Sequence, residues 1–158
     1  MVNSWAVDYD TANCTIAAAL GVVGEKWMFL VLREAFNGVR RFDEMQRRTG
    51  APRQVLSNRL ASLIDDGILR KTPYQEHGQR PRSEYRLTEK GVALFPVIAA
   101  LLAWGDAYAA PPGGSAVELT HRDCGAPVYL RLTCADGHQL DSAREVTPVP
   151  GPGARKVA

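Results

Sequence analysis

Two helical patterns on either side of a three-residue turn constrain the fold of this chain more than any other feature. Residues 41–49 predict a short helix, with Phe42 and Met45 three positions apart on its inner face. Residues 50–52 (Gly-Ala-Pro) interrupt the pattern, and proline suits the first position of a following helix. That second helix is predicted over residues 53–66, with an apolar stripe formed by Leu56, Leu60, Leu63 and Ile64. The order of a short helix, a glycine-containing turn and a second helix predicts a helix-turn-helix.

The second of these helices also has a polar face. A helix fits the major groove of DNA when one side packs on a core and the other side can meet base edges. Arginine can bond guanine, Gln and Asn can bond adenine, and Ser can donate or accept. The polar face carries residues of these types: Arg53, Gln54, Ser57, Asn58 and Arg59. Taken alone, the same pattern also fits an ordinary amphipathic surface helix.

Two short strands, over residues 68–72 and 83–87, are predicted to follow. The segment between them contains Gly and Pro, and a basic loop there would reach phosphates or a minor groove, where positive charge is favoured. The candidate contacts in this wing and its flank are Arg41, His77, Gln79, Arg80 and Arg82. A solvated hairpin is the alternative for the loop alone. Together the elements predict a mainly α fold with a small β component, a winged helix-turn-helix.

The charge of the chain is unevenly divided. Between Gly38 and Gly91 there are twelve Lys or Arg and seven Asp or Glu, so this stretch carries +5. Because the whole chain carries +2, the remainder carries −3. A basic central region is the electrostatic pattern expected of a domain that binds a polyanion.

Further helices are predicted on both sides of this unit. Residues 14–23 predict a short buried helix, and residues 26–36 predict a second one. A long helix is predicted from Thr88, a good N-cap residue, to about residue 108, with Pro96 bending it or delaying its start. The aromatic side chains of these helices are expected in the core, the alternative being that they line a pocket for a small-molecule effector; they are Trp27, Phe29, Trp104 and Tyr108.

The rest of the chain divides into short segments. Residues 1–13 are predicted to be flexible, residues 14–110 to form the DNA-binding and dimerisation domain, and residues 111–116 to be a linker. Three strands over 117–120, 128–133 and 139–146 predict a small β-meander within residues 117–147, with a hairpin at Asp136-Gly137. The Pro- and Gly-rich residues 148–158 are predicted to be disordered.

The predicted meander contains two Cys and two His. They stand at spacings of three and four with nine residues between the cysteines, and they are His121, Cys124, Cys134 and His138. This set could surround Zn²⁺ tetrahedrally, although it lacks the paired Cys-x-x-Cys of a regular zinc ribbon. The alternative is a meander whose turns contain these residues by chance. Apart from this zinc, no cofactor is expected.

Other classes of protein are disfavoured. No run reaches the ~18 apolar residues of a membrane helix, and the start of the chain lacks the pattern of a signal peptide. Three cysteines do not suggest a disulfide framework, so a cytoplasmic location is expected. No nucleophile elbow, phosphate loop or zinc-protease motif is present, so the chain is not expected to be an enzyme. The open alternative is a winged helix used only for protein interaction or dimerisation, but such a domain would not need a surplus of Arg on the reading face and wing.

Short motifs recur in order between residues 14 and 108. They are Cys14, Gly24-Glu25-Lys26-Trp27, Arg33-Glu34, Gly38 to Met45, Leu56 to Leu60, Leu63, Asp66 to Leu69, Glu84 to Gly91 and Leu102 to Gly105. In this order they resemble the HxlR-type family of bacterial winged helix-turn-helix transcriptional regulators, within the MarR-like superfamily. One departure is that Gly50-Ala51 offers no side-chain cap before the reading helix.

The resemblance implies several properties. Members of the family are homodimers whose first and last helices form the interface, and they repress or activate from palindromic operators. Two-fold pairing would place two reading helices about one DNA turn, ~34 Å, apart. In some members a cysteine at the place of Cys14 senses oxidants or electrophiles, and a helix N-terminus or Lys26 would favour its thiolate. The alternative is that Cys14 is a small buried hydrophobic residue.

Overall fold

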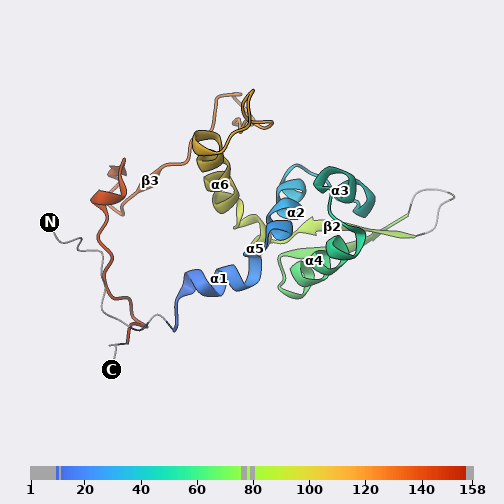
Figure 1. Cartoon of the computed structure of the whole chain (residues 1–158), viewed down its shortest axis with the longest axis horizontal. Helices are drawn as coiled ribbons and strands as arrows, with labels where there is room; N and C mark the ends of the chain where they lie inside the picture. The colour runs from blue at the N-terminus through green and yellow to red at the C-terminus, as the bar shows by residue number, and fades with distance from the viewer. Residues whose placement is uncertain (1–9, 11, 76–77, 79–80, 156–158) are drawn as a thin grey trace.

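The computed structural model describes residues 10, 12–75, 78 and 81–155. It is mainly helical with two small antiparallel sheets, as the sequence predicted. In Figure 1 the central helices and a β-hairpin form one body, while the first helix, the last α-helix and a C-terminal appendage extend away from it.

The core lies among three helices and the start of the hairpin. These are α2 (Lys26–Phe36), α3 (Phe42–Thr49), α4 (Arg53–Asp65) and strand β1 (Leu69–Tyr74). The predicted apolar stripe of α4 is buried through Leu56, Leu60 and Leu63, and it packs with Val31 and Leu32 of α2. A stripe of this kind removes several apolar side chains from water, at ~1.5–3 kcal/mol for each fully buried one. The packing therefore holds α4 with its opposite face outward.

The turn between α3 and α4 forms as the sequence predicted. Gly50 ends α3 with φ 69°, a left-handed conformation that glycine adopts without a Cβ penalty. The Thr49 hydroxyl donates to the Met45 carbonyl at 2.7 Å, and Ala51 is buried. Pro52 takes the N-cap position without a side-chain cap, and α4 begins at Arg53.

The wing is an antiparallel pair of β1 and β2 (Arg82–Leu87), in which Leu69 is paired with Leu87 and Tyr74 with Arg82. The chain before α3 joins its edge, because Arg41 forms a bridge with Glu84 and the Tyr85 amide donates to the Arg40 carbonyl at 2.8 Å. The wing is thus fixed to the start of the helix-turn-helix.

The predicted long C-terminal helix is two helices, α5 (Glu89–Val92) and α6 (Phe95–Tyr108). Thr88 caps α5 by accepting from the Gly91 amide at 3.1 Å, and Pro96 stands in the first turn of α6, as expected of a proline that delays a helix. Gly91 is buried, and a Cβ at this position would lie 2.2 Å from the Ile68 carbonyl oxygen.

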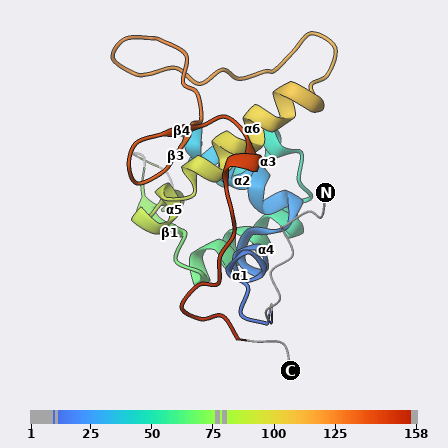
Figure 2. The same ribbon diagram turned by 90° about the vertical axis from the view of Figure 1, so that its left-hand side faces the viewer.

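The outer helices differ from the sequence prediction. Helix α1 (Thr15–Val23) was expected to be buried, but Val23 is its one buried residue and Ile16 and Leu20 are exposed. On α6, Trp104 and Tyr108 are 61% and 77% exposed rather than in the core, and their rings lie 5.6 Å apart. Figure 2, in which the left-hand side of Figure 1 faces the viewer, shows α1 end-on in front of α4. Both helices therefore present apolar side chains that the described part of the chain leaves exposed.

The appendage contains less strand than predicted. Its regular pairing is a bridge between Thr120 and Pro127 and a hairpin of β3 (Leu132–Thr133) and β4 (Gln139–Leu140). The hairpin at Asp136-Gly137 is confirmed. The third predicted strand ends at Leu140, and the 3-10 helix η1 (Ala143–Glu145) follows, with a capping box formed by Ser142 and Glu145. The following residues turn back, so that the Gly153 and Arg155 carbonyls accept hydrogen bonds from Asn13 and Asp10.

Candidate nucleic-acid interface

The outward face of α4 presents four of the five predicted reading residues. Arg53, Gln54, Ser57 and Asn58 are exposed, and they lie within the first two turns of the helix. The Gln54 side-chain amide donates to the Asn58 side-chain oxygen at 2.9 Å, so these two amides lie side by side. This face offers donors and acceptors of the kind that read base edges.

Arg59 lies elsewhere. Its side chain is 26% exposed and forms an ion pair with Glu25, the residue that precedes α2. Its Nε is buried, with no hydrogen-bond partner among the described residues. Arg59 flanks the apolar stripe, next to Leu60. Its side chain is therefore directed toward the body of the domain and does not belong to the outward face of α4.

A concave surface of about 730 Å³ lies between the start of α3, the start of α4 and the wing. Four of its lining residues are cationic, namely Arg41, Arg53, Lys71 and Arg82. Two are acidic and the other six are polar or aromatic: Asp43, Glu44, Phe42, Gln54, Ser57, Tyr74, Ser83 and Tyr85. We call this surface the basic cleft. Cations, phenols and amides lining a concave surface beside an exposed helix are suited to a nucleic-acid backbone.

Aromatic rings position two of the arginines in the basic cleft. The Arg53 guanidinium lies 4.8 Å from the Phe42 ring centroid and 3.8 Å from an Asp43 carboxylate oxygen. The Arg41 guanidinium lies 4.8 Å from the Tyr74 ring centroid. Such stacking restricts a guanidinium while leaving N–H groups to donate.

The phenol of Tyr85 lines the same cleft. Burial raises the pKa of Tyr85, so its hydroxyl stays protonated at neutral pH and keeps its ability to donate a hydrogen bond. Its ring also packs on the core, which couples the cleft to the body of the domain.

On the wing, Arg82 is exposed and Lys71 faces the cleft from β1. Lys71 was not among the residues predicted from sequence; the structure pairs it directly with Tyr85 in the hairpin register. The other predicted wing residues, His77, Gln79 and Arg80, lie outside the described residues.

A buried carboxylate joins α2 to the first helix of the helix-turn-helix, α3. It was not among the predicted site residues. Glu34 of α2 is 2% exposed and pairs with Arg48 of α3 at 2.5 Å and with Arg33 at 2.6 Å. Burial alone would raise the pKa of Glu34, but hydrogen bonds from Arg48 and Arg33 outweigh it and hold that pKa below its usual value. The pattern Arg33-Glu34 in a buried helix was the available signal.

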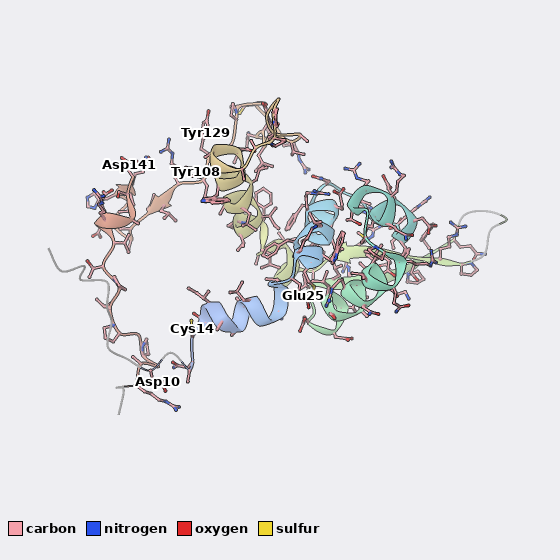
Figure 3. All side chains as sticks on the ribbon, viewed as in Figure 1. Asp10, Cys14, Glu25, Tyr108, Tyr129 and Asp141 are labelled. Carbon is pink, nitrogen blue, oxygen red and sulfur yellow. The ribbon has the colours of Figure 1, made fainter. Side chains whose placement is uncertain are left out.

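Cys14 occupies the N-cap position of α1 and is half-buried. Figure 3 shows Cys14 and Glu25 at opposite ends of α1, so Lys26, which follows Glu25, is not a neighbour of the thiol. Of the two neighbours predicted for Cys14, the structure therefore retains the N-terminus of α1.

The four predicted metal ligands form two separate pairs. The Cys124 Sγ lies 3.3 Å from the His121 Nδ1, and the Cys134 Sγ lies 3.4 Å from the His138 Nδ1. Among the described residues, the one group of three metal-ligating side chains is Cys134, Asp136 and His138. The tetrahedral set of all four is therefore not assembled within this chain.

The family model described as HxlR-like helix-turn-helix matches residues 22–112, which hold α2 to α6 and therefore the basic cleft. A regulator of Mycobacterium tuberculosis described as an uncharacterized HTH-type transcriptional regulator is 45% identical over 139 residues, covering 88% of this chain and 87% of its own length. A second HTH-type regulator, from Methanothermobacter thermautotrophicus, is 37% identical over 63% of this chain and 75% of its own length.

Solved structures agree with these relatives. The crystal structure of PA1607, a candidate transcription factor, has a TM-score of 0.77 and 38% identity, covering 89% of this chain and 96% of that one. The redox regulator HypR in its oxidized form has a TM-score of 0.55 and 30% identity, covering 60% of this chain and 96% of that one. On the family match, the relatives and the winged helix-turn-helix itself, this chain belongs to the HxlR-like helix-turn-helix family of transcriptional regulators.

Proposed function

We propose that this regulator recognises a palindromic operator as a homodimer, with α4 in the major groove and the wing on the flanking backbone. The observation that carries the proposal is the basic cleft, in which Arg41, Arg53, Lys71 and Arg82 converge beside the exposed amides of α4. Arg41, Lys71 and Arg82 are assigned to phosphates, and Arg53, Gln54, Ser57 and Asn58 to bases. The unit from residue 14 to residue 110 is proposed to carry both DNA binding and dimerisation. The cytoplasm is the proposed location of the protein.

The homodimer is supported by the outer helices. Ile16 and Leu20 on α1 and Leu101 and Trp104 on α6 are about half exposed or more, although they are apolar. The stretch Glu89–Tyr108 is also long and apolar enough to span a membrane by length and composition, although it is not an uninterrupted apolar run. It is broken between α5 and α6, and a second copy of the same helices is the proposed cover of its apolar face.

The test is selection of duplex DNA from a random library by the full chain, followed by titration of the selected site and a scrambled control at two salt concentrations. Enrichment of an inverted repeat whose half-site centres are one helical turn apart, ~10 base pairs, is expected. Equal and steeply salt-dependent binding of both DNAs would argue against sequence recognition. No binding at either salt would favour the alternative of a winged helix used only for protein interaction.

Cys14 is the proposed input for a redox or electrophile signal. It stands at the start of the helix that forms part of the proposed dimer interface, and the similar protein HypR is named a redox regulator. Treatment with a peroxide or a quinone should change the affinity for the selected DNA in the wild type and not in Cys14→Ser. Cys124→Ser is the matched control, and loss of the response in that variant instead would remove Cys14 from the proposal.

A further inference from the structure

The turn between β3 and β4 brings three metal-ligating side chains together. The ligand atoms of Cys134, Asp136 and His138 all lie within 4.8 Å of one another, and the Cys134 Sγ and His138 Nδ1 are 3.4 Å apart. In a tetrahedral zinc site, bond lengths of ~2.3 Å to sulfur and ~2.0 Å to nitrogen place these atoms roughly 3.5 Å apart. The pair is therefore already at the separation that one ion requires.

The backbone holds this turn in the chelating shape. The Gly137 amide donates to the Cys134 carbonyl at 2.9 Å, and the Cys134 amide donates to the His138 carbonyl at 3.0 Å. Gly137 has φ 84°, which closes the turn and directs the chain back into β4. Because the main chain fixes both ends of the turn, little conformational entropy remains to be lost when an ion binds.

The surrounding segment lacks an apolar core of its own. No residue from 111 to 155, all of which the structure describes, is buried. Short segments of this kind are commonly stabilised by a metal or by disulfides, because apolar burial alone is insufficient. The structure contains free cysteines here and no disulfide among the described residues.

We propose that Cys134, Asp136 and His138 form a binding site for a thiophilic divalent cation of the Zn²⁺ class. A thiolate, an imidazole and a carboxylate suit zinc, and the exposure of Asp136 and His138 leaves the fourth position to water. Binding displaces the Cys134 thiol proton to solvent, so that the thiolate is the sulfur ligand.

The chain provides its own matched control. The Cys124 Sγ and the His121 Nδ1 are 3.3 Å apart, almost the same distance as in the Cys134–His138 pair. No third ligand joins them among the described residues. Two ligands hold zinc far less tightly than three, so His121 and Cys124 should not contribute to zinc binding.

The experiment is competition for Zn²⁺ between the full reduced chain and a chromophoric chelator, with stoichiometry from native mass spectrometry. One ion per chain is expected, with affinity lowered at least ~100-fold by Cys134→Ser or His138→Ala and about tenfold by Asp136→Asn. Cys124→Ser and His121→Ala should bind as the wild type does. Circular dichroism of each variant checks that the helical domain is intact, and it should be, since the turn lies outside the core.

Two results would overturn the proposal. The first is a wild-type chain that fails to compete for zinc. The second is an equal loss of affinity in Cys124→Ser and Cys134→Ser, which would assign the ion to a four-ligand site assembled from both pairs. Neither result depends on DNA binding, so the metal site and the proposed operator recognition are tested separately.

Discussion

The carboxylate of Glu34 accepts a hydrogen bond from the Arg48 Nε at 2.5 Å, and this contact joins α2 to α3. Arg33 donates to the other carboxylate oxygen at 2.7 Å. Both oxygens of a side chain that is 2% exposed are therefore satisfied by cations. Removal of the charge would leave two guanidinium groups without their anionic acceptor.

Glu34→Gln is expected to lower the free energy of unfolding by about 2 kcal/mol, because the arginines lose a charge-assisted acceptor in a buried setting. Denaturant unfolding at neutral pH measures this as a lower midpoint with an unchanged slope. Glu44→Gln is the control, since Glu44 is 44% exposed and lies 3.8 Å from Arg47. It should change stability by less than ~0.5 kcal/mol, and similar losses in the two variants would refute the bracing role of Glu34.

The same carboxylate makes stability depend on pH. Hydrogen bonds from Arg48 and Arg33 overcome the effect of burial and lower the pKa of Glu34 from its usual 4.5, so the unfolded chain binds this proton more readily than the folded one. The stabilisation is complete above pH 4.5 and is lost as the pH falls through the lower folded value. The difference in unfolding free energy between the wild type and Glu34→Gln should therefore shrink on acidification below that pH. A difference that stays constant would show that the carboxylate does not titrate as described.

Gln54 and Arg59 should behave differently although both belong to α4. Gln54→Ala is expected to relax base preference at particular positions of the selected site, by ~1–3 kcal/mol if the contact is bidentate, with little change in stability. Arg59→Ala should instead lower stability, because it removes the ion pair with Glu25, and leave base preference unchanged. Binding to single-base variants of the site, together with thermal unfolding, separates these effects. A change of base preference in Arg59→Ala would return that residue to the reading face.

Arg82 is expected to contact a phosphate. Arg82→Ala should weaken binding to selected and scrambled DNA alike, and reduce the slope of log affinity against log salt by about one. Arg122→Ala removes the same charge from the appendage, which Figure 1 shows on the side away from the wing, and it should leave the slope unchanged. Equal slopes for Arg82→Ala and the wild type would exclude Arg82 from the interface.

Trp104 tests the proposed dimer. The side chain is 61% exposed on α6, so Trp104→Glu should leave the helical core folded while placing a charge in the interface. Sedimentation velocity should then show a monomer where the wild type is a dimer. Val149→Glu, at a residue that is 70% exposed in the C-terminal tail, should remain dimeric. A wild-type chain that sediments as a monomer would contradict the proposal directly.

The helix-turn-helix could be predicted from sequence because its signals are local. The bounds of α2 agree with the prediction, and those of α3 and α4 agree within one residue. In each case a run of apolar residues at helical spacing ends at a residue such as Gly50 that stops a helix.

The remaining differences concern neighbours that are distant in sequence. Periodicity identifies the apolar faces of α1 and α6, but it does not tell whether the same chain covers them, so Trp104 and Tyr108 were wrongly expected in the core. Arg59 lies at the border of the apolar stripe, and only the position of Glu25 assigns it to the body of the domain. The position of Lys71 in the basic cleft depends on the register of the hairpin, which the sequence did not specify.

The close approach of Gly91 to Ile68 has a geometric consequence for any assembly of this chain. Since a Cβ at 91 would lie 2.2 Å from the Ile68 carbonyl oxygen, α5 rests main chain against main chain on the residue that precedes β1. No side chain of Gly91 separates the two backbones, and α6 begins after only Ala93 and Leu94. The contact therefore connects the base of the wing to the apolar helix through the main chain. If α6 forms the proposed two-fold interface, this contact sets the distance and angle between the two α4 helices, and with them the spacing of the proposed half-sites.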